Sequence, residues 1–219
     1  MTAKDDGTRR PGRERRQRML AAATRLFVER GFDGTSVDEI IQAVGGSKTT
    51  LYSAFGNKQG LFAAVVGDVT TRLDAAIAVG DAGGAAGRRR APADVLTDVG
   101  TAAMTIVLSE EVIGLYRLAV AEANRYPDLA RSFWEKGPSS ARAGLAAYFA
   151  DATVHGELAI DDPAEAAELF LGMLLDRGTL GLSLGVLAPP PRTEIDRRVA
   201  AATRVFMAAY GRRDSGPRD

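Results

Sequence analysis

The stretch Thr35–Phe55 constrains the fold of this chain most strongly, because it combines two short helical segments with a glycine turn. Ser36 begins the first segment, and Glu39 three residues later completes a capping box. Gly45-Gly46 ends that segment, since glycine tolerates the positive φ of a sharp turn. Ser47 then caps a second helix. This order predicts a helix-turn-helix, in which the second helix enters the major groove of DNA.

The second helix carries its large apolar side chains on one side. Leu51 and Phe55 stand four residues apart, so we expect both to point inwards. Polar side chains on the other side suit base edges and thymine methyl groups, and helix N-termini suit phosphates. For Lys48 the alternative is a solvated surface lysine, and for Ser36 it is capping alone. The residues expected to contact DNA on these grounds are Thr35, Ser36, Ser47, Lys48, Thr49, Thr50 and Ser53.

This stretch and the residues after it resemble the signature of the TetR/AcrR repressor family. The matching residues are Ser47-Lys48-Thr49-Thr50-Leu51-Tyr52, Phe55, Asn57-Lys58 and Leu61-Phe62, with Gly31-Phe32 and Thr35 upstream. Gly46 and Thr49 depart from the family pattern, so no operator sequence is inferred. The resemblance implies that the Tyr52 hydroxyl and the Lys58 ammonium also contact phosphates. Half-buried packing of its ring is the alternative for Tyr52.

Composition restricts the classes of protein that remain. The chain has 219 residues, of which 46% are hydrophobic, so a substantial core is expected. There is no cysteine and one histidine, His155, so we expect no disulfide, no metal site and no cofactor. No long uninterrupted apolar run and no apolar leader occur, which favours a reducing cytoplasm as the location.

Catalytic motifs are also missing from the sequence. It contains no cysteine nucleophile, no histidine within an obvious catalytic constellation and no phosphate-binding loop, so we do not expect an enzyme. The other class that stays open is an all-helical small-molecule-binding or scaffold protein that does not bind DNA.

Charge is unevenly distributed along the chain. Residues 1–60 hold 11 Lys and Arg against 7 Asp and Glu, although the net charge of the whole chain is zero. A basic first part fits a DNA-binding segment. Residues 1–12 are expected to form a disordered basic arm. Whether the arginines around it are solvated or contact DNA stays open; they are Arg9, Arg10, Arg13, Arg15, Arg16 and Arg18.

Helical periodicity and helix breakers predict an all-α fold of about nine to ten helices. A three-helix DNA-binding head is expected over residues 13–73, with its motif at about 36–55, and an effector-binding and dimerisation domain over 74–219. The expected helices, besides the two in the motif, are 13–30, 58–79, 92–108, 110–126, 128–136, 138–154, 162–187 and 193–210, with a linker over 80–91. Residues 116–129 also resemble a C-terminal domain type of some TetR-like repressors.

The last two helices mix large and small residues, which lets helices approach closely. In the family the equivalent helices form a four-helix bundle across a two-fold axis, so the resemblance implies a homodimer. Packing within one chain is the alternative. The residues expected at the interface are Leu171, Gly172, Leu175, Thr179, Leu182, Val199, Ala202, Val205, Phe206 and Ala209.

Large adaptable side chains and two acidic residues also occur on the C-terminal helices. They are expected to line a pocket for a small, largely apolar effector, with core packing and salt bridges as the alternatives. These residues are Met104, Tyr116, Glu122, Trp134, Tyr148, Phe170, Met173 and Asp176. The sequence therefore predicts a ligand-responsive repressor that binds a palindromic operator as a homodimer. The effector, the target genes and the sign of regulation are not predicted.

Overall fold

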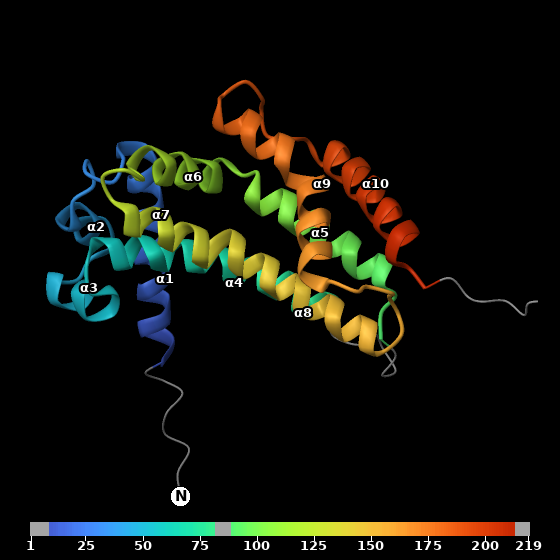
Figure 1. Cartoon of the computed structure of the whole chain (residues 1–219). Coiled ribbons are helices and arrows are strands. Elements are labelled where there is room, and N and C mark those ends of the chain that lie inside the picture. Colours follow the sequence, from blue (N-terminus) through green and yellow to red (C-terminus); the bar gives the residue numbers. More distant parts are fainter. Residues whose placement is uncertain (1–8, 82–88, 213–219) are drawn as a thin grey trace, which may run out of the picture. The chain divides into compact units, whose positions relative to one another are not determined.

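The computed structural model describes residues 9–81 and 89–212, and Figure 1 labels its helices. In these ranges the chain forms ten α-helices and a π-helical turn, with no strand beyond an isolated bridge between Leu158 and Gly211. The predicted all-α class is confirmed. The elements are α1 (Arg9–Arg30), α2 (Val37–Val44), α3 (Lys48–Phe55), α4 (Lys58–Asp81), α5 (Pro92–Val107), α6 (Glu110–Glu122), α7 (Pro127–Trp134), the π-helical turn Glu135–Ser139, α8 (Ser140–Val154), α9 (Pro163–Ser183) and α10 (Arg192–Tyr210).

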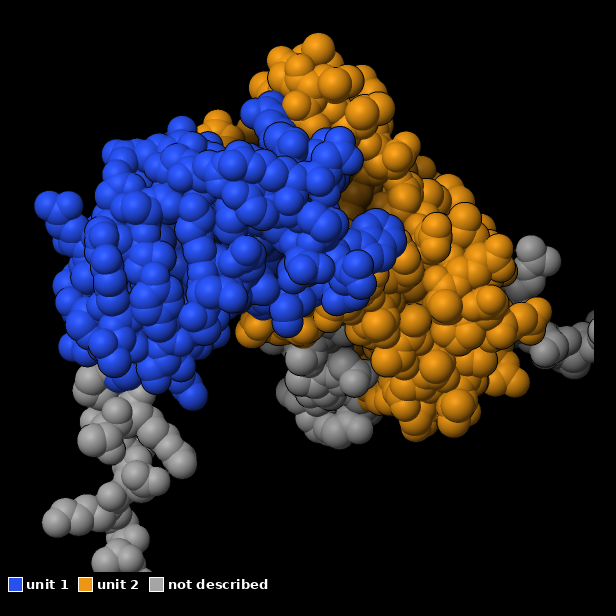
Figure 2. Space-filling model, turned by 60° about the vertical axis from the view of Figure 1, so that its left-hand side comes forward, with its two compact units in different colours: residues 1–69, 114–137 blue, residues 70–113, 138–219 orange. Residues whose placement is uncertain are grey.

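The chain divides into two compact units, shown in blue and orange in Figure 2. Unit 1 comprises residues 1–69 and 114–137, and unit 2 comprises residues 70–113 and 138–219. The boundary expected after residue 73 places 114–137 in the second domain, whereas the structure packs this segment with the helices of the head. Sequence order cannot reveal such a return of the chain. Both α4 and α6 contain residues of each unit.

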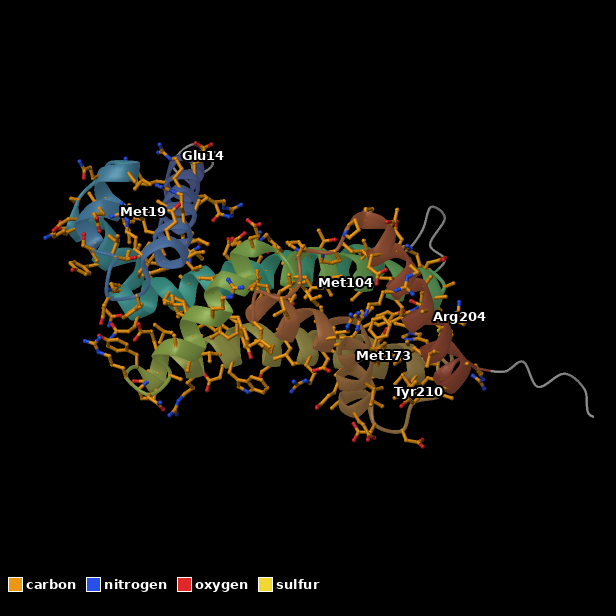
Figure 3. The ribbon with its side chains drawn as sticks, turned by 90° about the horizontal axis from the view of Figure 1, so that it is seen from above. Glu14, Met19, Met104, Met173, Arg204 and Tyr210 are labelled. Atoms are coloured by element: carbon orange, nitrogen blue, oxygen red, sulfur yellow. The ribbon has the colours of Figure 1, made fainter. Side chains whose placement is uncertain are left out.

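Unit 1 is built on an apolar stripe of α1, which includes Met19 (labelled in Figure 3) and Phe27. Gly31 ends the helix at φ 76°, a left-handed conformation that glycine adopts without strain. Phe32 then turns inwards, and its ring stacks on that of Phe27 with centroids 5.7 Å apart. Phe62 of α4 completes the cluster, 5.8 Å from Phe27.

Unit 2 packs α5, α8, α9 and α10 around buried aromatic rings. Phe206 of α10 stacks on Phe149 at 4.8 Å and meets the edge of Phe170 at 5.3 Å between centroids. Gly100 of α5 lets α10 approach closely, because a Cβ at this position would lie 3.1 Å from a methyl group of Val199. The core of unit 2 is therefore filled by side chains of its own chain.

Several helix boundaries differ from those predicted. Helix α1 begins at Arg9, so the last residues of the expected arm are helical, while residues 1–8 lie outside the described part. Residues 82–88 of the expected linker also lie outside it. Arg89 pairs with Asp151 and Glu157, and Arg90 with Asp98, rather than extending into solvent. Over the described ranges, no helix is both long enough and apolar enough to cross a bilayer.

Candidate nucleic-acid interface

Helix α2 begins with the predicted capping box, which is confirmed in both directions. The Ser36 hydroxyl accepts the backbone N–H of Glu39 at 3.2 Å, and the Glu39 carboxylate accepts the Ser36 N–H at 2.9 Å. Hydrogen bonds from the Ser36 backbone and side chain, followed by the charge of Arg30, hold the pKa of Glu39 below its ordinary value. The start of α2 is thus fixed by local bonds.

A two-glycine turn joins α2 to the recognition helix α3. Gly45 has φ 75° and Gly46 has φ 126°. A Cβ at Gly46 would lie 3.7 Å from Met19, an ordinary contact, so the backbone conformation rather than space requires glycine there. Ser47 caps α3 by accepting the Thr50 N–H at 3.2 Å.

Helix α3 has the two faces that the sequence predicts. Leu51 and Phe55 are buried, which anchors one face in unit 1. Thr49 and Ser53 are exposed, and so is the Tyr52 ring at 44%. Thr50 is half-buried, and its hydroxyl shares a hydrogen bond of 3.0 Å with that of Ser47. The open face therefore presents hydroxyl groups in a short polar surface, suited to base edges and phosphates.

Two lysines flank this face, and both already have partners. Lys48 Nζ lies 2.9 Å from the Asp38 carboxylate, which raises the pKa of this ammonium. Lys58 Nζ donates to the Thr35 carbonyl at 2.8 Å and lies 4.5 Å from the Phe32 ring centroid. Burial lowers the pKa of Lys58, although nearby carboxylates oppose the shift. A phosphate that binds Lys48 must compete with Asp38.

The prediction that the Thr35 side chain contacts DNA is wrong. Thr35 is fully buried, and its hydroxyl donates to the Gly31 carbonyl at 2.8 Å. Its side chain satisfies a carbonyl at the end of α1, which leaves no donor for a phosphate. Ser36 stays exposed, with its hydroxyl engaged in the capping box.

Sequence reasoning left the N-terminal arginines undecided. Arg13, Arg15, Arg16 and Arg18 are exposed, and the guanidinium of Arg16 lies 5.3 Å from the centroid of the Phe55 ring at the end of α3. This cation–π contact places a positive charge beside the recognition helix. The side chains of Arg9 and Arg10 lie outside the described residues.

The residues expected at the dimer interface do not share one surface. Gly172, Val205 and Ala209 are exposed, and Leu171, Leu175 and Thr179 are half-buried. The other four are buried inside unit 2, so their prediction as interface residues is wrong; these are Leu182, Val199, Ala202 and Phe206. Small residues allow close helix packing within a chain as well as between chains, and here they serve the internal contact.

The residues expected to line one pocket are likewise dispersed. Tyr116, Glu122 and Trp134 belong to unit 1, and the other five belong to unit 2. Trp134 is 54% exposed and Asp176 is exposed on α9, which contradicts their placement in a cavity. Met104, Tyr148 and Phe170 are buried in the packed core of unit 2, as the alternative of core packing predicts, and Met173 packs against that core. Figure 3 labels Met104 and Met173 on their helices.

Known proteins resemble this chain in sequence and in fold. A 64-residue segment is 42% identical to the HTH-type transcriptional repressor BdcR of Escherichia coli (strain K12), covering 28% of this chain and 32% of that protein. The chain thus spans about a third of the length of this curated relative. A solved structure of a TetR-family transcriptional regulator from Mesorhizobium loti MAFF303099 is 28% identical, with a TM-score of 0.77, over 92% of this chain and 98% of that one.

A second solved structure, the flavonoid-responsive regulator FrrA, is also 28% identical, with a TM-score of 0.66, over 91% of this chain and 98% of that chain. Two family models match the sequence. The model for bacterial regulatory proteins of the tetR family matches residues 19–65, and the model for the C-terminal domain of AefR-like transcriptional repressors matches residues 94–212. Because the second match alone spans more than half of the chain, this chain belongs to the TetR family of bacterial transcriptional regulators.

Proposed function

We propose that this chain is a ligand-responsive repressor that binds a palindromic operator as a homodimer and is released from it by a small molecule. It would act in the cytoplasm, where the operator DNA lies. The observation that carries the proposal is the two-faced helix α3, anchored by Leu51 and Phe55 and exposing Thr49, Tyr52 and Ser53.

DNA binding follows from the chemistry of this exposed face. Hydroxyl groups of Ser47, Thr49 and Ser53 can donate to base edges and phosphate oxygens, and the exposed Tyr52 side chain can offer its hydroxyl to a phosphate. Lys48 adds a cation at the N-terminus of α3, where the helix dipole also favours an anion. An ammonium has three donors, so Lys58 can keep its bond to Thr35 and still meet a phosphate.

A homodimer is supported by exposed apolar side chains that share one side of α9 with Asp176. Leu169, Gly172 and Leu180 follow helical spacing along this face, and the two leucines are 50% and 62% exposed. On α10, Val205 is 55% exposed and Ala209 is exposed one turn later. Large exposed apolar side chains at such spacing are typical of a surface that a partner covers. Pairing also suits operator binding, since one recognition helix reads few base pairs and a dimer reads two half-sites.

Effector release is supported by the relative FrrA, whose name describes it as flavonoid-responsive. We propose that a small, largely apolar molecule, with flavonoids as the first class to test, favours a conformation that binds the operator less well. By linkage, operator DNA must then weaken effector binding by the same factor. A flavonoid that binds should raise the thermal unfolding midpoint of the protein and release it from DNA.

The proposal is tested by a gel shift with duplex DNA from upstream of the gene that encodes this chain, competed with unrelated duplex. We expect a specific complex that weakens as salt is raised. No complex with this duplex, and none with any duplex selected from a randomised pool, would favour the alternative, a helical ligand-binding or scaffold protein without DNA binding.

A further inference from the structure

The turn between α1 and α2 is held by residues that lie some ninety positions later in the chain. Asp33 in this turn accepts a hydrogen bond from the Tyr126 hydroxyl at 2.7 Å, through Oδ1. Its other oxygen, Oδ2, pairs with the Arg125 guanidinium. All three residues belong to unit 1. We call this group of Asp33, Arg125 and Tyr126 the Asp33 contact.

An aromatic contact supports the polar one. The Tyr126 ring lies 5.0 Å from the ring of Phe32, between centroids, while its hydroxyl reaches Asp33. The Arg125 guanidinium lies 5.2 Å from the Tyr126 ring centroid. Phe32 thus makes an apolar contact with Tyr126, and the adjacent Asp33 makes polar contacts with Tyr126 and Arg125. Together these contacts fix the distance between the two segments and their relative orientation.

The same turn leads directly into the DNA-binding helices. Thr35 follows Asp33 and Gly34, and its carbonyl accepts a hydrogen bond from the Lys58 ammonium. Ser36, the next residue, caps α2. Only Gly45, Gly46 and Ser47 separate the end of α2 from the start of α3. Because these links are short and α2 and α3 are each eight residues long, the position of the turn constrains the recognition helix.

The contact is well placed to act on position rather than on overall stability. The side chains of Asp33 and Arg125 are 41% and 66% exposed. Exposed ion pairs contribute little to folding, because water and salt screen them. Such a contact can still bias the relative position of two segments that are distant in sequence, by as much free energy as it contributes to folding.

We propose that the Asp33 contact is a positioning device for DNA recognition, through which Arg125 and Tyr126 set the orientation of α2 and α3. Residues 125 and 126 lie within the match to the C-terminal domain of AefR-like repressors, whereas Asp33 lies within the match to the DNA-binding domain. The contact therefore joins the region that matches the C-terminal domain directly to the region that matches the DNA-binding domain. This inference rests on the proposed DNA binding.

The test compares Asp33→Asn and Tyr126→Phe in the full-length chain with a matched control, Asp196→Asn. Asp196 also pairs with an exposed arginine, Arg192, but lies in unit 2. Affinity is measured by fluorescence anisotropy with the duplex found in the gel shift, and thermal unfolding is recorded for each variant. Hydrogen exchange of residues 31–40 is followed without DNA.

We expect both unit 1 variants to bind the duplex about threefold to tenfold more weakly, with faster exchange over residues 31–40 and unfolding midpoints lowered by a few degrees, because the free energy lost from recognition cannot exceed that lost from folding. The control should match the parent in all three measurements. For Asp33→Asn the sign is decisive, because removing a negative charge should tighten binding to DNA if the residue acts only through its charge.

Unchanged exchange over residues 31–40 in both variants would overturn the positioning role, whether or not DNA binds. Faster exchange with parental or tighter affinity would overturn the link to recognition. If the parent binds no duplex, the proposed function fails, and the exchange data still decide whether residues 125 and 126 order the turn.

Discussion

The DNA-binding helices of unit 1 and the long helices of unit 2 are held in place by different means. Helices α2 and α3 are eight residues long, and each begins with a serine whose hydroxyl accepts a backbone N–H. Helices α5 and α10 are 16 and 19 residues long and begin without a side-chain cap bond, whereas α9, with 21 residues, begins with one from Asp162. Helices of eight residues are too short to be stable alone, so caps matter there, whereas long helices depend on packing.

The two units are therefore sensitive to different kinds of substitution. In unit 1, single polar groups such as the Ser36 hydroxyl set the ends of the helices that present the recognition surface. In unit 2, stability resides in buried rings and in close helix contacts such as that of Gly100 with Val199. The following experiments test that contrast, beginning with the largest expected effect.

Adjacent residues on α10 should differ greatly in their contribution to stability. Phe206→Ala removes a ring that is 1% exposed and packs on Phe149 and Phe170, so we expect a loss of about 3–5 kcal/mol in the free energy of unfolding. Val205→Ala changes a side chain that is 55% exposed, and should cost less than about 0.5 kcal/mol in a monomer. Urea unfolding at low protein concentration measures both. Equal losses would contradict the orientation of α10.

Two substitutions to larger residues should separate internal packing from dimer contact. Ala202→Trp overpacks the core of unit 2 and should lower the free energy of unfolding by about 1–3 kcal/mol. A Cβ at Gly172 would meet no described atom within 4 Å, so the monomer should tolerate Gly172→Leu on this open side of α9 apart from effects on helix propensity.

If α9 forms the dimer contact, Gly172→Leu should instead shift the sedimentation profile towards monomer. Val154→Arg, at an 84% exposed position on α8, serves as the control for a surface change elsewhere in unit 2. Sedimentation of the parent as a monomer at micromolar concentration would already rule out the proposed dimer.

Lys48 and Asp38 should have opposite effects on DNA binding. Lys48→Ala removes the proposed phosphate contact, so affinity should fall for all sequences and the slope of log K against log salt should decrease by about one. Asp38→Asn frees the ammonium from its 2.9 Å ion pair and should strengthen binding, most of all to unrelated duplex. A salt titration by fluorescence anisotropy compares the variants. Identical curves for Lys48→Ala and the parent would refute the role of this lysine.

The smallest expected effect concerns acid. The pKa of Glu39 lies below its ordinary value because the ionised carboxylate accepts hydrogen bonds from Ser36. This stabilisation is present above the ordinary pKa of glutamate and is lost as pH falls through the lowered value in the folded state. Glu39→Gln keeps an acceptor but does not titrate.

The unfolding free energy of the parent should therefore exceed that of Glu39→Gln most at neutral pH, and the difference should shrink as the solution is acidified below about pH 4. Chemical unfolding at a series of pH values measures this. A difference that is constant with pH would show that the ionised carboxylate adds nothing at the start of α2.

The helices of the DNA-binding head could be predicted from the sequence because caps, turns and buried faces there are set by residues close together in the chain. Ser36 and Glu39 form a box within three residues, and Gly45 and Gly46 mark the turn by a conformation that other residues adopt at a cost. The pair Leu51 and Phe55 could be assigned to the buried face by spacing alone. Such features depend on neighbours in the chain and do not require knowledge of the tertiary contacts.

Only the tertiary structure decided which side of each long helix is buried and which distant segments meet. Ala202 and Phe206 fit an interface between copies and a core within one chain equally well by residue type, and the structure places them in the core. The bond between Asp33 and Tyr126 joins residues 93 positions apart, for which no local pattern exists. Caps and turns are encoded by adjacent residues, whereas packing partners depend on how the whole chain returns on itself.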